Sequence, residues 1–562
     1  MSTQPTNSDV ASVFSRLADY LEVAGENPFK TRAYRNAADL LVSLDEPIAQ
    51  IAAAGRLRDL PGFGDAIVSK TQDILATGTT AAYEAMRAKI PEGVLDFLSL
   101  PGIGVKTVAQ LWNGLHVDSL DALEAAAREG RVQGLKGMSE KTAAKILEAI
   151  ERRSRFRGVL LVDSGSNLAE TLRDHIAADP SVQQIEIAGD LRRGCETVSQ
   201  LTIVASSLDF NATLDAASSS ARVSSVIDRS ADRIRLVLGG RAQADVYVCA
   251  PALFGALLAS ETGSAAHVTR LRALAAKRGM EPAFAAPDED AFYAALGLPP
   301  ISPPLREDRG EIEAALAGTL PNLIRVSDIR GNLHQHTTAS DGHDTLEDMA
   351  VVGKQRGYEY MAITDHSQAL AMTNGLTVER LRAQIREVRE VEQRVGIRLL
   401  AGSEVDILGD GTMDFPDDVL AELDIVIASV HSRFNLPREE MTARIVRAVS
   451  NPHVDILAHP TGRLLASRDA YAVDMDAVIA AAHAGGAALE INASPERLDM
   501  NEYNARKAAE AGVPVAINTD AHRVGHLDFL RHGVAIAQRA WLEPRNVVNS
   551  LALPELLAWL HR

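Results

Sequence analysis

Cysteine, aromatic residues and long apolar runs are scarce in this chain. It has two cysteines, Cys195 and Cys249, and its aromatic fraction is 4%. Two cysteines are too few for a disulfide framework or a thiolate metal site, which argues against a small secreted scaffold. No run of about 18 apolar residues occurs, and the polar start from Met1 to Val10 lacks the pattern of a secretory signal. We therefore expect a cytoplasmic protein without a membrane partner.

Basic residues are also fewer than acidic ones. The chain has 57 Lys and Arg and 75 Asp and Glu, which gives a net charge of −18. A chain this acidic does not attract nucleic acid through its overall charge, although a local patch still can. One basic cluster runs from Arg152 to Arg157. It is either a solvated helix end or a contact with nucleic acid, and the sequence leaves both open.

An internal repeat marks the first part of the chain, whose apolar spacing predicts helices up to about residue 150. Leu60-Pro61-Gly62-Phe63-Gly64 recurs as Leu100-Pro101-Gly102-Ile103-Gly104, with a weaker copy at Leu135 to Ser139. Each copy precedes an amphipathic helical pattern that contains a lysine. Glycine lets a backbone approach closely, and the amides at a helix start can bind a phosphate. The turns resemble the helix-hairpin-helix motif, which implies DNA contacts independent of base sequence through Gly62, Gly64, Gly102, Gly104 and Lys106.

The predicted secondary structure changes twice in the remainder of the chain. Short β-like runs occur at residues 185–187, 201–204, 234–238 and 244–248, and a helical segment then ends in the proline-rich stretch from Leu298 to Pro304. From about residue 328, short apolar strands alternate with helices. This alternation predicts βα units and therefore a parallel sheet or barrel.

Histidine is concentrated in this last part, since only His116, His175 and His267 of the 15 histidines precede residue 330. In Leu333-His334-Gln335-His336 the two imidazoles are two residues apart, so in an extended chain both face one side and can bind the same metal. Asp341 follows in a turn. This spacing indicates the start of a metal site.

Ligand-type residues also end one predicted strand after another. The strands at 361–364, 398–402, 425–430, 456–458 and 515–519 lead into His366, Glu404, His431, His459, and the pair Asp520 and His522. A βα barrel forms its active site at the carboxyl ends of its strands, so the sequence predicts a metal centre there. The histidines without this placement are interpreted as ordinary ones: His343, His453, His483, His526, His532 and His561.

Residues 330–530 resemble the PHP (polymerase and histidinol phosphatase) family of phosphoesterases. The resemblance implies a distorted (β/α)7 barrel with up to three metals, Mn or Zn, and these ligands: His334, His336, Asp341, His366, Glu404, His431, His459, Asp520 and His522. Asn332 stands where the family has an Asp. In such a site two close metals would bind the scissile phosphate and activate a water, with Glu404 as the candidate bridging carboxylate. Arg463 is a candidate phosphate contact, the alternative being a surface arginine.

Residues 10–318 resemble a bacterial family X DNA polymerase. Phe29 to Arg35 matches its lyase-like domain, Gly189 to Gly194 its palm motif, and Thr262 to Ser264 with residues 305–312 its thumb. The resemblance places Lys70 where the family has a Schiff-base lysine that removes a 5′-deoxyribose phosphate. It also implies that Lys30 binds a 5′-phosphate and that Arg193 binds the incoming nucleotide.

The palm departs from the family pattern where its metals bind. Gln200-Leu201-Thr202 stands in place of Asp-x-Asp, so that of three carboxylates only Asp245 remains. Asp190 replaces a phosphate-binding serine, and thumb side chains of the family are replaced by Ser260, Glu261 and Val268. Phosphoryl transfer depends on metal positioning, so we expect primer extension to be weak or lost unless acids such as Asp190 and Glu196 substitute. Whether Mg or Mn binds in the palm, and whether deoxynucleotides bind, is left open.

The predicted fold class is a multidomain chain that combines mostly α helix-hairpin-helix domains, an α+β nucleotidyltransferase-like palm and thumb, and a C-terminal distorted (β/α)7 PHP barrel. The expected domains are a lyase-like domain at 1–85, a fingers-like domain at 86–157, the palm at 158–250, the thumb at 251–318, a linker at 319–329 and the barrel at 330–562.

We favour a monomeric, nucleoid-associated DNA repair protein whose PHP domain is a metal-dependent 3′-5′ exonuclease or phosphoesterase on gapped or 3′-ended DNA. The alternatives are an active gap-filling polymerase with PHP as its processing exonuclease, a histidinol-phosphatase-like small-molecule phosphatase, and a non-catalytic scaffold for DNA ends. The palm departure separates the first two. The hairpin repeats argue against the small-molecule phosphatase, and the complete ligand set argues against the scaffold.

Overall fold

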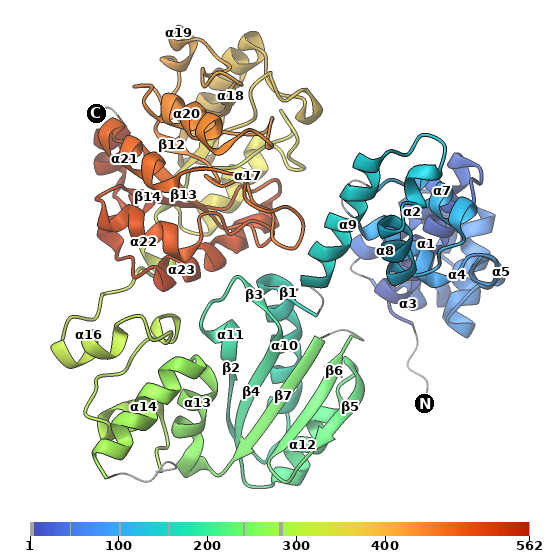
Figure 1. The fold of residues 1–562 in the computed structure, drawn as a ribbon, viewed down its shortest axis with the longest axis horizontal. Helices are drawn as coiled ribbons and strands as arrows, with labels where there is room; N and C mark the ends of the chain where they lie inside the picture. Colours follow the sequence, from blue (N-terminus) through green and yellow to red (C-terminus); the bar gives the residue numbers. More distant parts are fainter. Residues whose placement is uncertain are drawn as a thin grey trace. The chain divides into compact units, whose positions relative to one another are not determined.

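The computed structural model describes residues 5–44, 46–100, 103–155, 158–239, 242–279 and 285–560. The chain forms two compact units, Met1–Arg157 and Gly158–Arg562, coloured along the sequence in Figure 1. Gly102 of the second hairpin turn and the end of the basic cluster, Phe156 and Arg157, lie outside the described residues. Within the described ranges, no helix has the length and apolar character needed to cross a membrane.

The first unit consists of helices, as its apolar spacing predicts. Helix α1 (Asn7–Val23) begins after Thr6, whose side chain and that of Asp9 cap the helix reciprocally. Phe14, Leu17 and Leu21 lie on one face of α1 and are buried in the core of the unit. The other α-helices are α2 (Pro28–Ser43), α3 (Ile48–Ala53), α4 (Asp65–Thr77), α5 (Ala81–Lys89), α6 (Glu92–Leu95), α7 (Val105–Leu115), α8 (Leu120–Arg128) and α9 (Glu140–Arg155).

The first and third repeats form tight turns before α4 and α9, and the described residues of the second repeat lead into α7. One backbone hydrogen bond recurs in all three turns. It runs from the amide of Phe63 to Leu60, from Ile103 to Leu100 and from Met138 to Leu135, with N–O distances of 3.1, 3.1 and 3.0 Å. Gly62 has a φ of +79°, in the left-handed region that favours glycine. The sequence repeat is therefore also a structural repeat.

The second unit begins with a mixed β-sheet. Its strands are β2 (Val182–Ala188), β4 (Gln200–Ser207), β5 (Val223–Arg229), β6 (Arg233–Leu238) and β7 (Ala242–Cys249), and its helices are α10 (Val162–Ala177), α11 (Gly189–Arg192) and α12 (Phe210–Ser219). The strand order is β2-β4-β7-β6-β5 (Figure 1), with β4 and β7 parallel and the other neighbours antiparallel. Leu172 and Ile176 from α10 and Leu214 from α12 are buried in its core. A separate pair joins β1 (Leu160–Leu161) to β3 (Thr197–Val198).

Four helices follow the sheet: α13 (Phe254–Thr262), α14 (Ala265–Lys277), α15 (Glu289–Ala295) and α16 (Glu311–Ala317). They share a small core of their own, to which Leu271, Phe292 and Ile312 contribute. We refer to residues 158–318, the sheet and these helices together, as the middle region. It has the α+β character that the sequence predicts.

The rest of the second unit is a near-closed parallel barrel. Its strands, in chain and spatial order, are β8 (Gly331–Asn332), β9 (Tyr360–Ile363), β10 (Arg398–Asp406), β11 (Ile425–Ser429), β12 (Ile456–Leu457), β13 (Ala488–Asn492) and β14 (Val515–Asn518). Its helices are α17 (Leu346–Gln355), α18 (Val378–Val395), α19 (Asp417–Leu420), α20 (Arg438–Val449), α21 (Met475–Gly485), α22 (Glu502–Glu510), α23 (Leu530–Arg539) and α24 (Leu553–Leu560).

The first and last strands of the barrel approach each other just past their ends. Gln335 forms a parallel bridge with Ala521, and the amide of His336 donates to the carbonyl of Ala521 at 2.8 Å. Strands β9 and β11 to β14 are buried along their whole length, as expected where helices cover a parallel sheet. The predicted fold class, with its helix-hairpin-helix, α+β and barrel parts, is confirmed.

Candidate metal centre

The predicted metal ligands lie together at the carboxyl ends of the barrel strands. They are His334 and His336 after β8, Asp341 in the turn that follows, His366 after β9, Glu404 in β10, His431 after β11, His459 after β12, and Asp520 and His522 after β14. All are buried or partly buried. Successive parallel strands bring their ends to one edge of the barrel, which explains how residues so far apart in sequence converge.

Most of these side chains form three overlapping groups, in each of which the ligand atoms lie within 4.8 Å of one another. The groups are His336, Asp341, His366 and His522; His334, His336 and Asp520; and His366, Glu404 and His431. His336 and His366 each belong to two groups. Shared ligands are typical of metals that lie close enough to act on one substrate. These buried clusters of His, Asp and Glu suit several divalent metals.

Glu404 lies in the middle of the cluster. Its Oε2 is 2.9 Å from Nδ1 of His366 and 3.5 Å from Nε2 of His334. Its Oε1 is 2.9 Å from Nε2 of His459 and 3.4 Å from Nε2 of His431. The two oxygens of this carboxylate thus face different predicted ligands, as the oxygens of a bridging group would. His459, which belongs to none of the three groups, contacts the cluster through Glu404.

Strand β13, which was not among the predicted strands, places Glu490 beneath the cluster. Glu490 is fully buried. Its Oε1 lies 2.8 Å from Nδ1 of His334 and accepts a hydrogen bond from Nδ2 of Asn518 at 3.1 Å. Asn492, two residues further on, donates to Oδ2 of Asp520 at 3.0 Å. Such contacts orient ligands and fix which imidazole nitrogen faces a metal. An acidic residue inside the apolar run Ala488 to Ile491 was the available signal.

Asp365 holds the loop that leads to the predicted ligand Asp341. It directly precedes the predicted ligand His366 and was not itself predicted to bind metal. It is fully buried. Its Oδ1 accepts from the amide of Thr337 at 2.8 Å, its Oδ2 accepts from the Thr337 hydroxyl at 2.7 Å, and its Oδ1 also accepts from the Ser340 hydroxyl at 2.5 Å. The carboxylate is therefore used in fixing the backbone between His336 and Asp341.

Asn332, which replaces an Asp of the family pattern, supports the site differently. Its Nδ2 donates to the carbonyl of His334 at 2.9 Å, and its Oδ1 accepts from the amide of Thr519 at 3.0 Å. A carboxylate could make the second contact but not the first, because it has no donor. Asn332 therefore joins the segments that carry the first and last ligands.

Electrostatics within the cluster favour ionised carboxylates. Burial would raise the pKa of Glu404, but the surrounding histidines, His366 first, hold it well below its usual range. Burial would lower the pKa of His366, but Glu404 and Asp341 raise it to about 10. Burial, reinforced by His366 and His522, lowers the pKa of His336 to about 4. Metal binding at such a site is coupled to proton release from the histidines.

Two features indicate that the site suits metals. Within the described residues, Nδ1 of His336 and Nδ1 of His459 are buried without a hydrogen-bond partner, which is costly unless another group binds there. His459 and Asp520 also have left-handed φ angles of 28° and 50°, and backbone strain of this kind is concentrated at functional sites. Imidazole and carboxylate ligands together suit Zn and Mn.

Arg463, the predicted phosphate contact, donates its hydrogen bonds to other groups of the protein. Its Nη2 lies 2.7 Å from Oε1 of Glu196 and also donates to the carbonyl of Leu498, while its Nε donates to the carbonyl of Arg497 at 3.1 Å. Arg497 itself lies closer to the cluster, with its Nε 3.4 Å from Oδ2 of Asp520. The sequence did not single out Arg497, which carries no motif. The phosphate-binding role of Arg463 stays a prediction.

The palm residues lie side by side on the sheet of the middle region. Thr202 on β4 and Arg235 on β6 are both in register with Asp245 on β7, so the three side chains share one face. Arg235 binds the buried Asp245 with two hydrogen bonds, from Nε and Nη2, each of 2.8 Å. Gln200 donates to the same carboxylate. Both oxygens of Asp245 are therefore occupied by protein donors.

Arg193, the predicted nucleotide contact, is also engaged within the protein. Its Nε donates to Glu307 at 2.9 Å, its Nη1 to the carbonyl of Thr262 at 2.8 Å and its Nη2 to Asp190 at 2.5 Å. Glu307 accepts in turn from Arg539 of barrel helix α23 at 2.6 Å. The side chain of Arg193 is 11% exposed. Every nitrogen of this guanidinium thus has an acceptor in the second unit.

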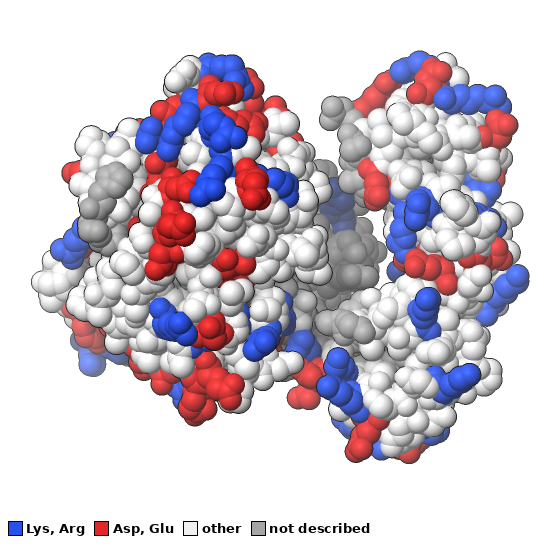
Figure 2. All heavy atoms as spheres, turned by 90° about the horizontal axis from the view of Figure 1, so that it is seen from above, with Lys and Arg blue, Asp and Glu red and all other residues white. Residues whose placement is uncertain are grey.

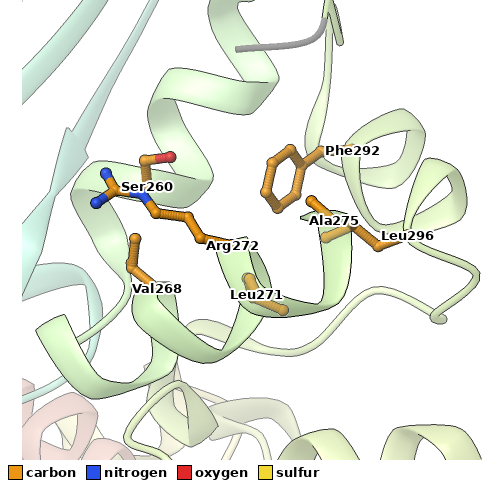
Figure 3. Close-up of a pocket in the computed structure, with 7 residues that line it drawn as sticks. All are labelled: Ser260, Val268, Leu271, Arg272, Ala275, Phe292 and Leu296. Atoms are coloured by element: carbon orange, nitrogen blue, oxygen red, sulfur yellow. The ribbon is translucent and has the colours of Figure 1, made fainter. Parts of the chain in front are cut away.

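A small cavity is lined in part by Ser260 and Val268, two of the residues that replace thumb side chains of the family (Figure 3). Its volume is about 50 Å³, and it is lined by Ser260, Val268, Leu271, Arg272, Ala275, Phe292 and Leu296. Ligand pockets usually measure at least about 300 Å³, whereas a single water occupies roughly 30 Å³. The cavity therefore has room for water but not for a nucleoside.

The predicted DNA contacts in the first unit lie at exposed helix starts. Gly64 and Gly104 are the N-caps of α4 and α7 and make no side-chain cap, and a Cβ at either would meet nothing within 4 Å. Lys106 is exposed in the first turn of α7. The free amides and open space let a phosphate approach these helices. Their binding roles stay predictions.

The two predicted lysines of the lyase-like domain lie on different helices. Lys70 is on α4, with its Nζ 3.4 Å from the carbonyl of Ala66 and 5.8 Å from the ring centre of Tyr34. Lys30 is on α2, with its Nζ 3.8 Å from Glu26. Tyr34 belongs to the stretch that matches the family motif, so Lys70 lies beside that motif in space as well.

Comparison with known families gives three matches that follow this architecture. A helix-hairpin-helix domain model matches residues 5–80, a SAM-like helix-hairpin-helix tandem model matches residues 94–152, and a PHP domain model matches residues 332–542. The metal centre described above lies wholly within the PHP match.

Individual relatives fall into two kinds. The barrel alone is similar to a probable phosphatase of Thermoanaerobacter sp. (strain X514), 32% identical over 39% of this chain and 89% of the relative, and to one of Shewanella sp. (strain MR-4), 34% identical over 34% of this chain and 75% of the relative. The whole chain is 36% identical over 569 residues to the DNA polymerase/3′-5′ exonuclease PolX of Bacillus subtilis (strain 168), covering 99% of both chains. With its hairpin repeats, middle region and PHP barrel in the same order over its full length, the chain belongs to the DNA polymerase/3′-5′ exonuclease PolX family.

Proposed function

We propose that this protein is a DNA repair enzyme whose PHP barrel removes nucleotides from DNA 3′ ends by metal-dependent hydrolysis, and whose primer extension is weak or lost. The observation that carries the proposal is the buried cluster of His, Asp and Glu at the carboxyl ends of the barrel strands. The experiment that tests it is incubation of the full-length protein with Mn²⁺ and a 5′-labelled primer on gapped DNA. Stepwise shortening of the primer supports the proposal, and an unchanged primer contradicts it.

The residues of the cluster have different proposed roles in hydrolysis. When bound, divalent metals polarise a phosphate and lower the pKa of water so that it can attack. The proposed ligands, Glu404 among them, would hold up to three such ions, Mn or Zn. Glu490 and Asn492 keep His334 and Asp520 oriented. Arg497, 3.4 Å from Asp520, is placed to hold a substrate phosphate by charge-assisted hydrogen bonds.

The weak polymerase is supported by the state of Asp245. Family X chemistry needs carboxylates to hold two ions, but Gln200 and Thr202 are neutral. The guanidinium of Arg235 occupies the one carboxylate that remains. A bidentate arginine is a strong, geometrically matched competitor for a divalent ion. The protein groups bound to Asp245 and Arg193 therefore compete with metal and triphosphate for these two side chains.

An active gap-filling polymerase is the second candidate, because the relative that matches the whole chain is named a DNA polymerase as well as an exonuclease. In that case Asp190 and Glu196 would have to leave Arg193 and Arg463, their present partners, to bind ions. The two relatives that match the barrel alone are named probable phosphatases, in line with a phosphatase as a further candidate. The hairpin repeats of the first unit favour DNA over both small-molecule and scaffold roles.

The first unit is expected to bind DNA by itself. A fragment of residues 1–157, which forms a compact unit, should keep most of the affinity of the full chain and lose it steeply with salt, because it contacts phosphates. On the face shown in Figure 2, Lys and Arg are interspersed with Asp and Glu rather than gathered in one broad area. Fluorescence anisotropy with two unrelated sequences measures both properties.

One lysine variant sharpens this measurement. Lys106→Ala should weaken binding about equally for both sequences and reduce the salt slope by about one ion, as expected for a single phosphate contact. Lys89→Ala is the matched control, since Lys89 is exposed at the end of α5, outside the three turns. A fragment that binds no DNA at low salt, while the full chain does, would refute the hairpin assignment.

Lys70 is expected to form a covalent adduct with a 5′-deoxyribose phosphate end. An unprotonated amine attacks the sugar aldehyde, and borohydride reduces the resulting Schiff base to a stable cross-link. Lys70→Ala should abolish the cross-linked band, whereas Lys30→Ala should only weaken substrate binding, because we expect Lys30 to contact a phosphate. Trapping that is unchanged in Lys70→Ala would show that this lysine is an ordinary surface residue or a phosphate contact.

A further inference from the structure

A loop of the middle region contacts a loop of the barrel beside the candidate metal centre. Glu196, which follows α11 in the palm motif, lies 2.7 Å from Nη2 of Arg463. Arg463 comes four residues after the ligand His459. The side chains of Glu196 and Arg463 are 20% and 14% exposed. This ion pair thus joins the middle region to the segment that carries a proposed metal ligand.

Arg463 also holds the loop that follows β13. Its Nε donates to the carbonyl of Arg497 at 3.1 Å, and its Nη2 donates to the carbonyl of Leu498. Leu498 has a left-handed φ of 40°, so this backbone depends on contacts that hold it in place. The side chain of Arg497 reaches to 3.4 Å from Asp520. One guanidinium therefore fixes the residue that approaches the metal centre most closely from this loop.

Further bonds make the two barrel loops a single assembly. Asp499 accepts from the amide of Thr461 at 3.0 Å and from its hydroxyl at 2.9 Å. The amide of Leu465 donates to the carbonyl of Glu496 at 2.6 Å. A displacement of Arg463 would therefore be transmitted to both loops, and so to His459 on one side and to Arg497 on the other.

We infer that Glu196 is a positioning residue for hydrolysis in the barrel: through Arg463 it holds the loops that carry His459 and Arg497 at the metal centre. This inference rests on the proposed function. Without Glu196, Arg463 would be a largely buried cation with only backbone carbonyls as partners, and breaking a buried pair by removing one partner is strongly destabilising locally. Arg463 would then turn toward water and release the carbonyls of residues 497 and 498.

The expected kinetic signature is a loss of turnover rather than of DNA affinity. Removing groups that orient metal ligands typically lowers activity by 10- to 100-fold, so Glu196→Ala should lower kcat about tenfold. KM for DNA should change less than kcat, because Glu196 is bound to Arg463 and not to substrate. Hydrolysis of bis(p-nitrophenyl) phosphate, a small diester that needs no DNA-binding surface, should fall by the same factor.

The experiment compares five variants of the full-length protein loaded with Mn²⁺, one of them a control. Glu196→Gln keeps an oxygen that accepts from Arg463 and should restore part of the lost kcat. Arg463→Ala should lose at least as much as Glu196→Ala, and the Glu196→Ala, Arg463→Ala double variant no more than Arg463→Ala alone. Asp163→Asn is the matched control, since Asp163 faces Arg531 and His532 of the barrel at 3.6 Å but contacts neither loop. Its kcat should equal that of the wild type.

Metal content and melting temperature, measured on every variant, separate a positioning effect from loss of fold. Wild-type kcat in folded Glu196→Ala would overturn the inference, as would a change confined to KM for DNA, which would make Glu196 a DNA contact. A further loss in the double variant beyond Arg463→Ala would also overturn it. A wild type that hydrolyses the small diester but not DNA would overturn the proposed function. The kcat of the Glu196 variants for the small diester would then decide whether Glu196 is a positioning residue.

Discussion

Replacing His366 and Asp520 together by alanine is expected to lower hydrolysis of DNA 3′ ends by at least about a thousandfold while leaving the fold intact. His366 belongs to two of the three ligand groups and Asp520 to the other, so the double variant damages every proposed metal position. A loss of about 4 kcal/mol in transition-state stabilisation corresponds to that factor, at 1.36 kcal/mol per tenfold. The measurement is the initial rate of nucleotide release with Mn²⁺, together with metal content by mass spectrometry.

His483→Ala is the control for this variant. His483 is exposed on α21 and belongs to none of the ligand groups among the described residues, so its loss should change neither rate nor metal content. Circular dichroism should give the same spectrum for all three proteins. Full nuclease activity in the double variant would show that the reaction does not use this cluster.

Primer extension is expected to be slower than about 1 per second, the lower end of typical enzyme turnover. The reason is the ion pair between Asp245 and Arg235, which leaves the palm with no free carboxylate at the three matched positions. The measurement is single-turnover insertion on gapped DNA with Mn²⁺. It uses the His366→Ala, Asp520→Ala background, so that degradation cannot hide synthesis.

A gain-of-function variant tests the same reasoning by restoring the missing carboxylates. Gln200→Asp with Thr202→Asp restores two carboxylates next to Asp245 on the sheet, and we expect insertion to rise by about tenfold or more, as for recovery of a catalytic metal ligand. Gln243→Asp is the matched control, because Gln243 lies one strand over, in register with Gln200, but is exposed. Rapid insertion by the unmodified palm, abolished by Asp245→Ala, would contradict the account.

The convergence of these ligand-type side chains could be predicted from sequence because each of them is a local signal. Each of His366, Glu404, His431 and His459 stands at or just beyond the end of an apolar run, and the barrel topology alone brings such positions together. Glu490 was missed because its strand, β13, was not recognised. Its role also depends on a contact with His334, 156 residues away, which no local pattern encodes.

The palm shows what a motif alone cannot reveal. The sequence indicated that two carboxylates are replaced, but not that Arg235 binds the third, because this depends on the register between β6 and β7. Arg463 and Arg193 were expected to contact phosphates because motifs place them near a site. The structure directs both toward carboxylates. Arg463 binds Glu196, whose proximity arises from the packing of the middle region against the barrel, and Arg193 binds Glu307 within the middle region.

The most direct test of the central claim follows a 5′-labelled primer on gapped DNA, with full-length protein, Mn²⁺ and all four deoxynucleotides present. If the barrel is a metal-dependent 3′-5′ exonuclease and the palm is impaired, the primer shortens stepwise, a chelator stops the shortening, and added Mn²⁺ restores it. A primer that instead grows to fill the gap, or one that stays unchanged in protein shown to carry metal, would contradict the account.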